Sequence, residues 1–466
     1  MSARWLAALA FVASRLVYRI FFGVSFDTSP AHYFLQLLDP WFLQHDLLRS
    51  VLSLHHQAPL LNLALGLSLK CFGDSAYLAL DVAFIALGLW AAISLADVLE
   101  RLGVKPVMAA IAAALFACSP TTVIYESWLF YSHVVASLLI ISAAALARWV
   151  IAPSPRRGIV FFALLAAIGL TRSTFGPLWF LVVTGALLLL APVPRRAIAK
   201  AMALPLFVLL LHAAKTPLYV GVGYGDAMLW PNLAKKVFVA LPRSEQRKLL
   251  QRRRLSPAIR FEAFTDLAAM QKVRIPHEPT GIPALDDERA PNGRSNANAI
   301  EYALIAERHS KRDALFLVKT HPKAYALATL DALGQMARVA TSDSTLPHNP
   351  NFHRLAALNA AVAWLALAPS GGFSATVLAG LLIAIVACLV SLLGKRARAE
   401  PARRSLAAFA LLTIGYTTAV SVLVSWGDFP RYRFEIDGLY WIFTILGMTL
   451  VLERVGLALQ ARRRKQ

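Results

Sequence analysis

Long apolar runs separated by short polar loops recur along this chain, and the pattern predicts a helical membrane protein. The hydrocarbon core of a bilayer holds no water for backbone amides, so apolar runs that cross it must form helices. The fold class predicted is therefore an all-α polytopic membrane protein with about ten or eleven transmembrane helices. The expected spans are 5–23, 76–98, 106–121, 128–150, 158–171, 176–191, 199–214, 373–393, 405–424 and 438–453.

One apolar stretch, 355–368, leaves the number of spans open. It is shorter than the roughly 20 residues that a span needs. Counting it as a span would also move the basic loop after residue 394 to the other face of the membrane. We therefore expect this stretch to be interfacial or re-entrant.

Composition and charge support the membrane assignment. The chain is 58% hydrophobic and 16% charged, with a mean hydropathy of +0.58. Much of the net charge of +21 lies in short loops between the predicted spans, which marks those loops as cytoplasmic. No nucleic-acid-binding motif accompanies the charge, so we expect membrane lipids and no nucleic acid as partners. The Ala- and Arg-rich composition favours a multi-pass protein of a bacterial inner membrane.

The alternation of basic and near-neutral loops divides the chain into three parts. Residues 1–214 form an N-terminal transmembrane module that includes a first outer loop, 24–75. Residues 215–352 form a large outer loop, and residues 353–466 form a C-terminal transmembrane module. Within the large loop, the Pro-, Gly- and Asn-rich stretch 276–298 predicts irregular structure. We expect this loop to act as a periplasmic lid and not as an independent domain.

The first outer loop gathers acids and histidines directly after the first span. Ionisable groups at a membrane face are candidates for function, and here they are Asp27, Asp39, His55 and His56. For each aspartate the alternative is a helix N-cap, a strong alternative for Asp39 because Pro40 follows it. The histidines suit a phosphate or metal ligand, or equally an interfacial cap.

Further candidates lie where other predicted spans reach the outer face. Glu126 could bind a metal ion or a sugar, or form a structural salt bridge. The basic candidates Arg172, Lys215, Arg431 and Arg433 come from distant parts of the chain. They could converge on a phosphate, for which arginine offers a planar fork and lysine a point charge. The alternative for each is snorkelling to lipid head groups.

Two arginines of the first span are expected to have a structural role. Arg15 and Arg19 lie one helical turn apart, and Arg15 is too deep to snorkel easily. We expect them to face the protein interior and to pair with an acid such as Asp81.

The order of these features along the chain, and their expected location on the outer membrane face, resemble the GT-C superfamily of integral-membrane glycosyltransferases. The resemblance is to the branch of protein O-mannosyltransferases and lipid A aminoarabinose transferases. Asp27 in FDTSP lies at the position of that family's acid, and HHQAPLLNLALGL is similar to its HxQPPLxxxxLGL run. The chain departs from the family at Thr28, where an Asp-Glu pair is usual, and at Ala58, which replaces a proline. YESWLFYSH, LTRSTFGPLW, AAKTPLYVG and RYRFEIDGLYW resemble later outer turns of the family.

The resemblance implies a glycosyltransferase that moves a sugar from a polyprenyl-phosphate donor to an unidentified acceptor at the periplasmic face. It implies interfacial helices in the first outer loop and Asp27, or else Asp39, as the catalytic base. It implies substrate binding by the histidines, Glu126 and the four basic residues. The site residues allow but do not require a divalent cation such as Mg²⁺ or Mn²⁺. The alternative functions are a polymerase or ligase of lipid-linked polysaccharide and a membrane transporter.

Overall fold

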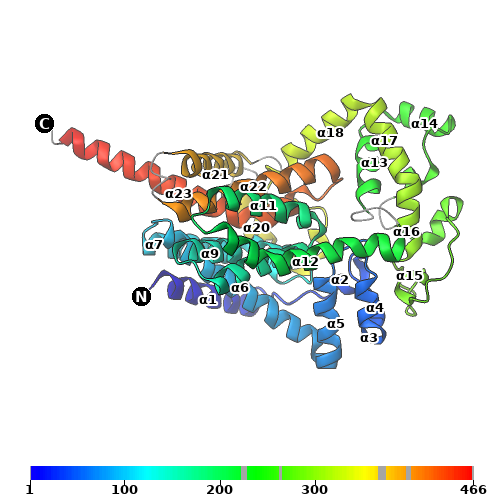
Figure 1. The fold of residues 1–466 in the computed structure, drawn as a ribbon, viewed down its shortest axis with the longest axis horizontal. Helices are drawn as coiled ribbons and strands as arrows, with labels where there is room; N and C mark the ends of the chain where they lie inside the picture. Colours follow the sequence, from blue (N-terminus) through cyan, green and yellow to red (C-terminus); the bar gives the residue numbers. More distant parts are fainter. Residues whose placement is uncertain (1, 222–227, 262–264, 366–373, 395–399, 464–466) are drawn as a thin grey trace.

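The computed structural model describes residues 2–221, 228–261, 265–365, 374–394 and 400–463, and it is helical almost throughout (Figure 1). In these ranges the β-type pairing consists of two isolated bridges, Asp27 with Trp128 and Arg289 with Ser295. The all-α fold class predicted from the sequence is confirmed.

A bundle of long helices makes up most of the molecule (Figure 1). Several of its helices begin with proline at the first position, where the missing N–H costs no hydrogen bond. The bundle helices are α1 (Ala3–Phe21), α6 (Ala76–Arg101), α7 (Pro106–Ala117), α8 (Pro120–Glu126), α9 (Tyr131–Ile151), α10 (Pro155–Thr171), α11 (Pro177–Leu190), α12 (Arg195–Val220), α21 (Ala375–Leu393), α22 (Pro401–Val424) and α23 (Phe429–Arg463).

Six helical segments among the described residues are long and apolar enough to cross a membrane, or seven if α7 and α8, bent by 57°, form one span. The chain is thus a multi-pass membrane protein. The expected spans 5–23, 158–171 and 176–191 do fall on helices, α1, α10 and α11. However, α1 carries three arginines, and α10 and α11 are only 17 and 14 residues long. The six segments are Leu60–Arg101, Tyr131–Ile151, Arg195–Leu218, Ala375–Leu393, Pro401–Val424 and Phe429–Gly456.

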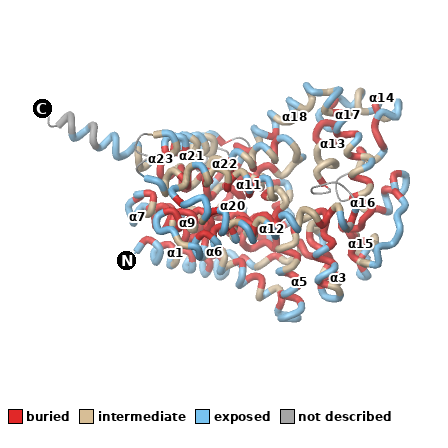
Figure 2. The backbone as a smooth tube through the Cα atoms, viewed as in Figure 1, coloured by how far each residue is buried: buried red, intermediate tan, exposed pale blue. Residues whose placement is uncertain are grey.

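Burial distinguishes central from peripheral helices (Figure 2). The most apolar part of α9 is 72% buried, whereas the corresponding parts of α12 and α21 are 22% buried. Around α9, large side chains such as Trp149, Phe161 and Trp179 fill the core. Leucines and Phe207 on the outside of α12 are exposed, as expected for a surface that faces lipid.

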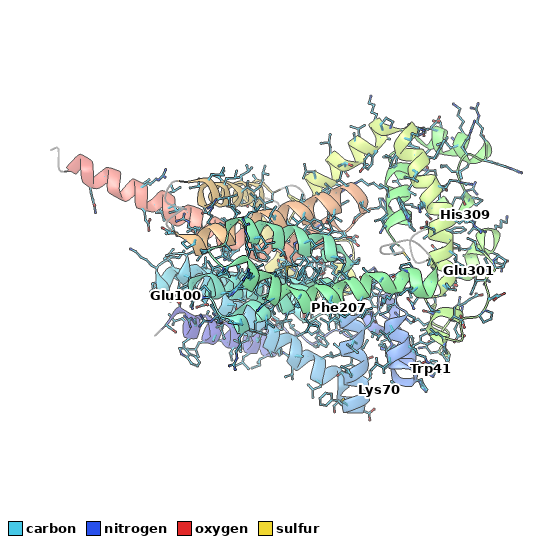
Figure 3. The ribbon with its side chains drawn as sticks, viewed as in Figure 1. Trp41, Lys70, Glu100, Phe207, Glu301 and His309 are labelled. Atoms are coloured by element: carbon cyan, nitrogen blue, oxygen red, sulfur yellow. The ribbon has the colours of Figure 1, made fainter. Side chains whose placement is uncertain are left out.

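The end of the bundle opposite the start of α1 and the end of α23, called the distal end below, carries the remaining elements (Figure 1). The first loop supplies α2 (Pro30–Tyr33), α3 (Pro40–His45), α4 (Leu47–Leu52) and α5 (Leu60–Phe72). Figure 3 shows Trp41 and Lys70 of this loop at the distal end, as well as Glu301 and His309 of the large loop. Glu100 marks the opposite end.

The large loop contains small apolar clusters of its own. One cluster joins α13 (Leu229–Val239), α14 (Arg243–Gln251) and α17 (Lys311–Thr320), and another surrounds Tyr302. The remaining α-helices here are α15 (Pro283–Asp286), α16 (Ile300–Ile305), α18 (Pro322–Gln335) and α19 (Pro350–Arg354). The stretch 276–298 is irregular apart from α15, as predicted. Whether the loop folds by itself stays a prediction.

The apolar stretch 355–368 begins with α20 (Ala356–Leu365), and its residues 366–368 lie outside the described residues. Ten helical residues extend about 15 Å, which is half of the hydrocarbon thickness. By itself, α20 is therefore too short to span the membrane.

Candidate functional site

Asp27 lies where the chain leaves α1 and crosses the distal end. Gly23 turns the backbone with a φ of 63°, and the following residues run extended beside the segment after α8. The Asp27 N–H donates to the Ser127 carbonyl at 2.8 Å, and the Leu129 N–H donates to the Asp27 carbonyl at 3.0 Å. This pairing holds the predicted acid against the segment after α8, about 100 residues away in sequence.

The carboxylate of Asp27 is buried and only half engaged. Its side chain is 8% exposed. Oδ1 accepts hydrogen bonds from the backbone N–H of Ser29 at 3.0 Å and from the Ser29 hydroxyl at 2.5 Å. Oδ2 is buried and has no hydrogen-bond partner within the described ranges. A buried carboxylate oxygen left without a partner is costly to stability, so it suits a group that accepts a proton during turnover.

An aromatic wall extends from Asp27 across the distal end. Trp128 stacks on Phe130 with ring centroids 4.7 Å apart, and Phe130 contacts Tyr131 at 4.1 Å. Phe34 of the first loop contacts both Trp128 and Phe130, at 5.4 and 5.1 Å. The wall therefore joins the first loop to the start of α9, beside the segment that pairs with the Asp27 backbone.

Two of the predicted phosphate ligands meet at the far side of this wall. The Arg172 guanidinium, at the C-terminal end of α10, lies 4.7 Å from the Tyr131 ring centroid and 4.1 Å from that of Tyr432. The Arg431 guanidinium, at the start of α23, lies 4.8 Å from Phe130 and 5.6 Å from Tyr131. The structure thus brings Arg172 and Arg431 together on one tyrosine.

Carboxylates accompany these arginines. Arg172 forms an ion pair with Glu435, which is fully buried. Arg431 donates to Asp428 at 2.5 Å, but its Nε and Nη1 have no partner in the described part of the chain. Arg433, two residues after Arg431 on α23, donates to Asp437 at 2.7 Å. Of the three, Arg431 keeps the most free donors for an anion.

A short turn places Asp428 against Arg431. Gly427 and Asp428 have φ values of 83° and 60° between α22 and α23. Glycine adopts this left-handed conformation freely, and aspartate tolerates it better than most residues. This turn directs the Asp428 side chain toward Arg431 in the first turn of α23, so local backbone geometry fixes the position of the carboxylate.

Asp343 is a second half-engaged acid, and the sequence interpretation missed it. Its Oδ1 accepts from the backbone N–H of Thr345 at 2.9 Å and from the Thr345 hydroxyl, while Oδ2 is buried without a partner among the described residues. Asp27 and Ser29 make the same arrangement. Burial raises the pKa of Asp343 above its usual value, and the charge of Arg431 opposes that shift. The shared pattern, an aspartate two residues before a hydroxyl residue, is a signal that could have revealed it.

Asp39 binds the stretch 276–298 and caps a helix. Its carboxylate accepts from the Trp41 N–H at 2.9 Å, which makes it the N-cap of α3. It also accepts from Asn292 at 2.9 Å and lies 3.7 Å from the guanidinium of Arg294. Asp39 is thus the N-cap of α3 and a member of the loop interface. Its role as an alternative base stays a prediction.

The two histidines bind the same stretch through Asn298. The backbone N–H of His55 donates to Asn298 Oδ1 at 3.0 Å, and the ring Nε2 of His55 lies 2.8 Å from the Asn298 backbone carbonyl. His56 Nδ1 lies 3.1 Å from Asn298 Oδ1, and its Nε2 lies 3.0 Å from the Leu35 carbonyl. Burial lowers the pKa of His55 to about 3 and that of His56 to about 4. Both rings are therefore neutral near pH 7.

Lys215 lies near the two histidines. Its Nζ is 3.3 Å from the Val51 carbonyl, at the end of α4, and its side chain is buried. Its positive charge contributes to the lowered pKa values of both His55 and His56. The convergence of Lys215 and Arg172 in one cavity stays a prediction, because their recorded contacts are with different elements.

Glu126 faces into the bundle. Both of its oxygens accept from Arg15, at 2.7 Å each. Arg19 pairs with Asp81 at 2.6 and 2.7 Å. The expected pairing with Asp81 is correct for Arg19 and wrong for Arg15, and the salt-bridge alternative for Glu126 is the one that the contacts support. In the described ranges no three His, Cys, Asp or Glu side chains form a metal-binding group.

No protein-family model matches the chain, and no curated protein is similar to it in sequence. Among solved structures, it is similar to the oligosaccharyltransferase of Archaeoglobus fulgidus tethered to an acceptor peptide, with a TM-score of 0.43 and 12% identity. It is also similar to AglB from the same organism in complex with an inhibitory peptide and a dolichol-phosphate, with a TM-score of 0.42 and 11% identity.

These matches cover 98% and 99% of this chain but only 50% and 52% of the archaeal chains, so this chain spans about half of their length. The archaeal enzymes are GT-C glycosyltransferases, the superfamily that the sequence resembles. Similarity of this degree carries no conclusion about activity. What this chain does has to be inferred from the residues at its distal end.

Proposed function

We propose that this chain is a membrane glycosyltransferase that uses a polyprenyl-phosphate-linked sugar at the periplasmic face. The observation that carries the proposal is the free, buried Oδ2 of Asp27 on an aromatic wall that also supports Arg172 and Arg431. Transfer from such a donor needs a proton acceptor for the incoming hydroxyl and a cation for the leaving phosphate.

In the proposed reaction Asp27 Oδ2 takes the proton of an acceptor hydroxyl. The acceptor oxygen forms a bond to the anomeric carbon as the bond from that carbon to the phosphate oxygen breaks. The electron pair of the broken bond stays on the leaving phosphate, whose charge Arg431 stabilises through its free Nε and Nη1. Arg172 and Glu435 hold Tyr131 and the neighbouring wall in place. A divalent cation would supply further charge stabilisation, but no step above depends on it.

The test is hydrolysis of the donor without an acceptor, using purified protein and a panel of polyprenyl-phosphate hexoses and aminosugars. A transferase releases sugar slowly to water, whereas a transporter leaves the donor intact. Asp27→Asn should lower transfer to a native acceptor roughly 10²–10⁴-fold, the usual contribution of a positioned base. The exposed Asp74→Asn is the matched control. If no donor of the panel is hydrolysed, the proposal fails.

The same series separates the two half-engaged acids. Asp343→Asn removes the second free carboxylate oxygen while Asp27 stays intact. A larger loss of transfer in Asp343→Asn than in Asp27→Asn would move the role of base to Asp343.

A further inference from the structure

A cavity of about 690 Å³ opens at the distal end beside Arg431. Its described walls come from α13, α18, the turn between α22 and α23, and Gln36 of the first loop. The volume falls in the range of cavities that bind small organic ligands. None of the site residues predicted from the sequence lines it.

The cavity adjoins the proposed reaction centre at three points. Asp428 lines it and also bonds Arg431 at 2.5 Å. Ser344 lines it as well, donates to Asp428 at 3.3 Å and directly follows Asp343. Gln36 is two residues after Phe34, which contacts the aromatic wall. A molecule in the cavity would therefore lie next to Asp428, which bonds Arg431, and next to Ser344, which follows Asp343.

The polar groups of the wall suit an uncharged ligand with many hydroxyls. Amide side chains come from Gln36, Asn232 and Gln335. Amides and carboxylates both match hydroxyl groups, because a hydroxyl donates and accepts at once. Gln335 and Asp331 are already joined by a 2.7 Å hydrogen bond on α18, which orients both groups.

Other ligand classes fit less well. An anionic ligand would meet two carboxylates, Asp331 and Asp428, and a single lysine, Lys236, in the described lining. A lipid chain would need an apolar lining throughout, and this lining mixes apolar residues with amides and acids. The indole of Trp426 provides a flat apolar surface of the kind that packs against a sugar ring.

We propose that this cavity is the acceptor site and that the acceptor is a saccharide. The inference rests on the proposed transferase function and specifies its acceptor class. The saccharide would enter beside Asp428 and Ser344, and its reacting hydroxyl would have to reach Asp27 Oδ2, the proposed base, on the side of the donor sugar opposite the leaving phosphate.

The test is direct binding of defined di- and trisaccharides of glucose, galactose, mannose, rhamnose and N-acetylglucosamine to purified protein. Saturation-transfer NMR reports binding in the absence of donor, and a synthetic peptide and a dispersed fatty acid serve as the other ligand classes. At least one saccharide should bind, and Trp426→Ala or Gln335→Ala should weaken it about tenfold. Trp90→Ala, an exposed tryptophan on α6, and Gln251→Ala, at the end of α14, are matched controls.

Acceptor-free hydrolysis of the donor separates the two proposals. If the protein hydrolyses donor but binds no saccharide, the acceptor inference is overturned while the function stands. Binding that survives in Trp426→Ala and Gln335→Ala, or selective binding of the peptide or the fatty acid, also overturns it. If no donor is hydrolysed, the proposed function fails, and with it the assignment as an acceptor site.

Discussion

Asn298→Ala should release the stretch 276–298 from the first loop. Asn298 is completely buried and makes contacts with both sides of this interface. Its Oδ1 accepts from the His55 N–H at 3.0 Å, and its Nδ2 donates to the Ala284 carbonyl at 3.2 Å. Alanine removes the side-chain amide and leaves His55, His56 and Ala284 each without that partner.

The magnitude follows from the buried groups that lose a partner. The backbone N–H of His55 is left without a partner in a site closed to solvent, whereas the Ala284 carbonyl still accepts from Asn296 at 3.0 Å. A buried group left unsatisfied costs about 1–3 kcal/mol, so we expect a cost of about 2 kcal/mol. A free-energy change of that size raises the population of the undocked stretch about 30-fold.

Hydrogen exchange followed by mass spectrometry measures this change directly. In Asn298→Ala, peptides covering 276–298 and 35–58 should exchange faster by a similar factor, while peptides of α9 keep their protection. Asn292→Ala is the graded control, because its side chain bonds the Asp39 carboxylate from an exposed position. Equal exchange in Asn298→Ala and the unchanged protein would refute the view that this amide holds the interface.

Two further predictions concern protonation and packing. The pKa values of His55 and His56, about 3 and 4 in the fold against an ordinary value of 6.5, mean that the unfolded chain binds more protons. The free energy of unfolding should therefore be highest above pH 6.5. Below that pH it should fall by about 1.4 kcal/mol per histidine for each pH unit, until the pH approaches the pKa values of the folded state. A melting temperature that does not change between pH 7 and 5 would contradict this. Gly88→Ala should destabilise the bundle by about 3 kcal/mol, because the new Cβ would overlap Glu126 Oε2, which Arg15 holds in place. Thermal unfolding tests this. The control is Gly185→Ala, whose new Cβ meets no atom within 4 Å, so its melting temperature should not change.

The helices of the bundle could be predicted from the sequence because apolar periodicity and length are local properties. The irregular stretch 276–298 was also predictable, since proline, glycine and asparagine disfavour regular structure locally. The number of spans was less predictable. In α1, arginines that find buried partners far away in sequence replace part of the apolar surface that a free-standing span would need.

Ion-pair partners were the main feature that local patterns could not supply. Arg15 and Arg19 lie on one face of α1, and the sequence offered Asp81 as a partner. In the fold, α6 supplies Asp81 to Arg19, but the bend between α7 and α8 brings Glu126 to Arg15. That choice depends on how three helices pack together. The same limit hid Asp343, whose distinguishing property is burial beside Arg431.

The pairing of the arginines bears on how a phosphate could bind. Arg172, Arg431 and Arg433 each have a carboxylate partner, so they differ in which guanidinium nitrogens stay unpaired and not in charge compensation. Arg431 is paired through Nη2 alone, which leaves Nε and Nη1 to form hydrogen bonds with an anion while Asp428 stays bound. Such partial compensation lowers the cost of burying the guanidinium before the donor arrives and keeps two directed donors for the leaving group. Asp428 therefore fixes the Arg431 guanidinium on the cavity side. The unpaired Nε and Nη1 are the groups that would bind the phosphate of the sugar donor.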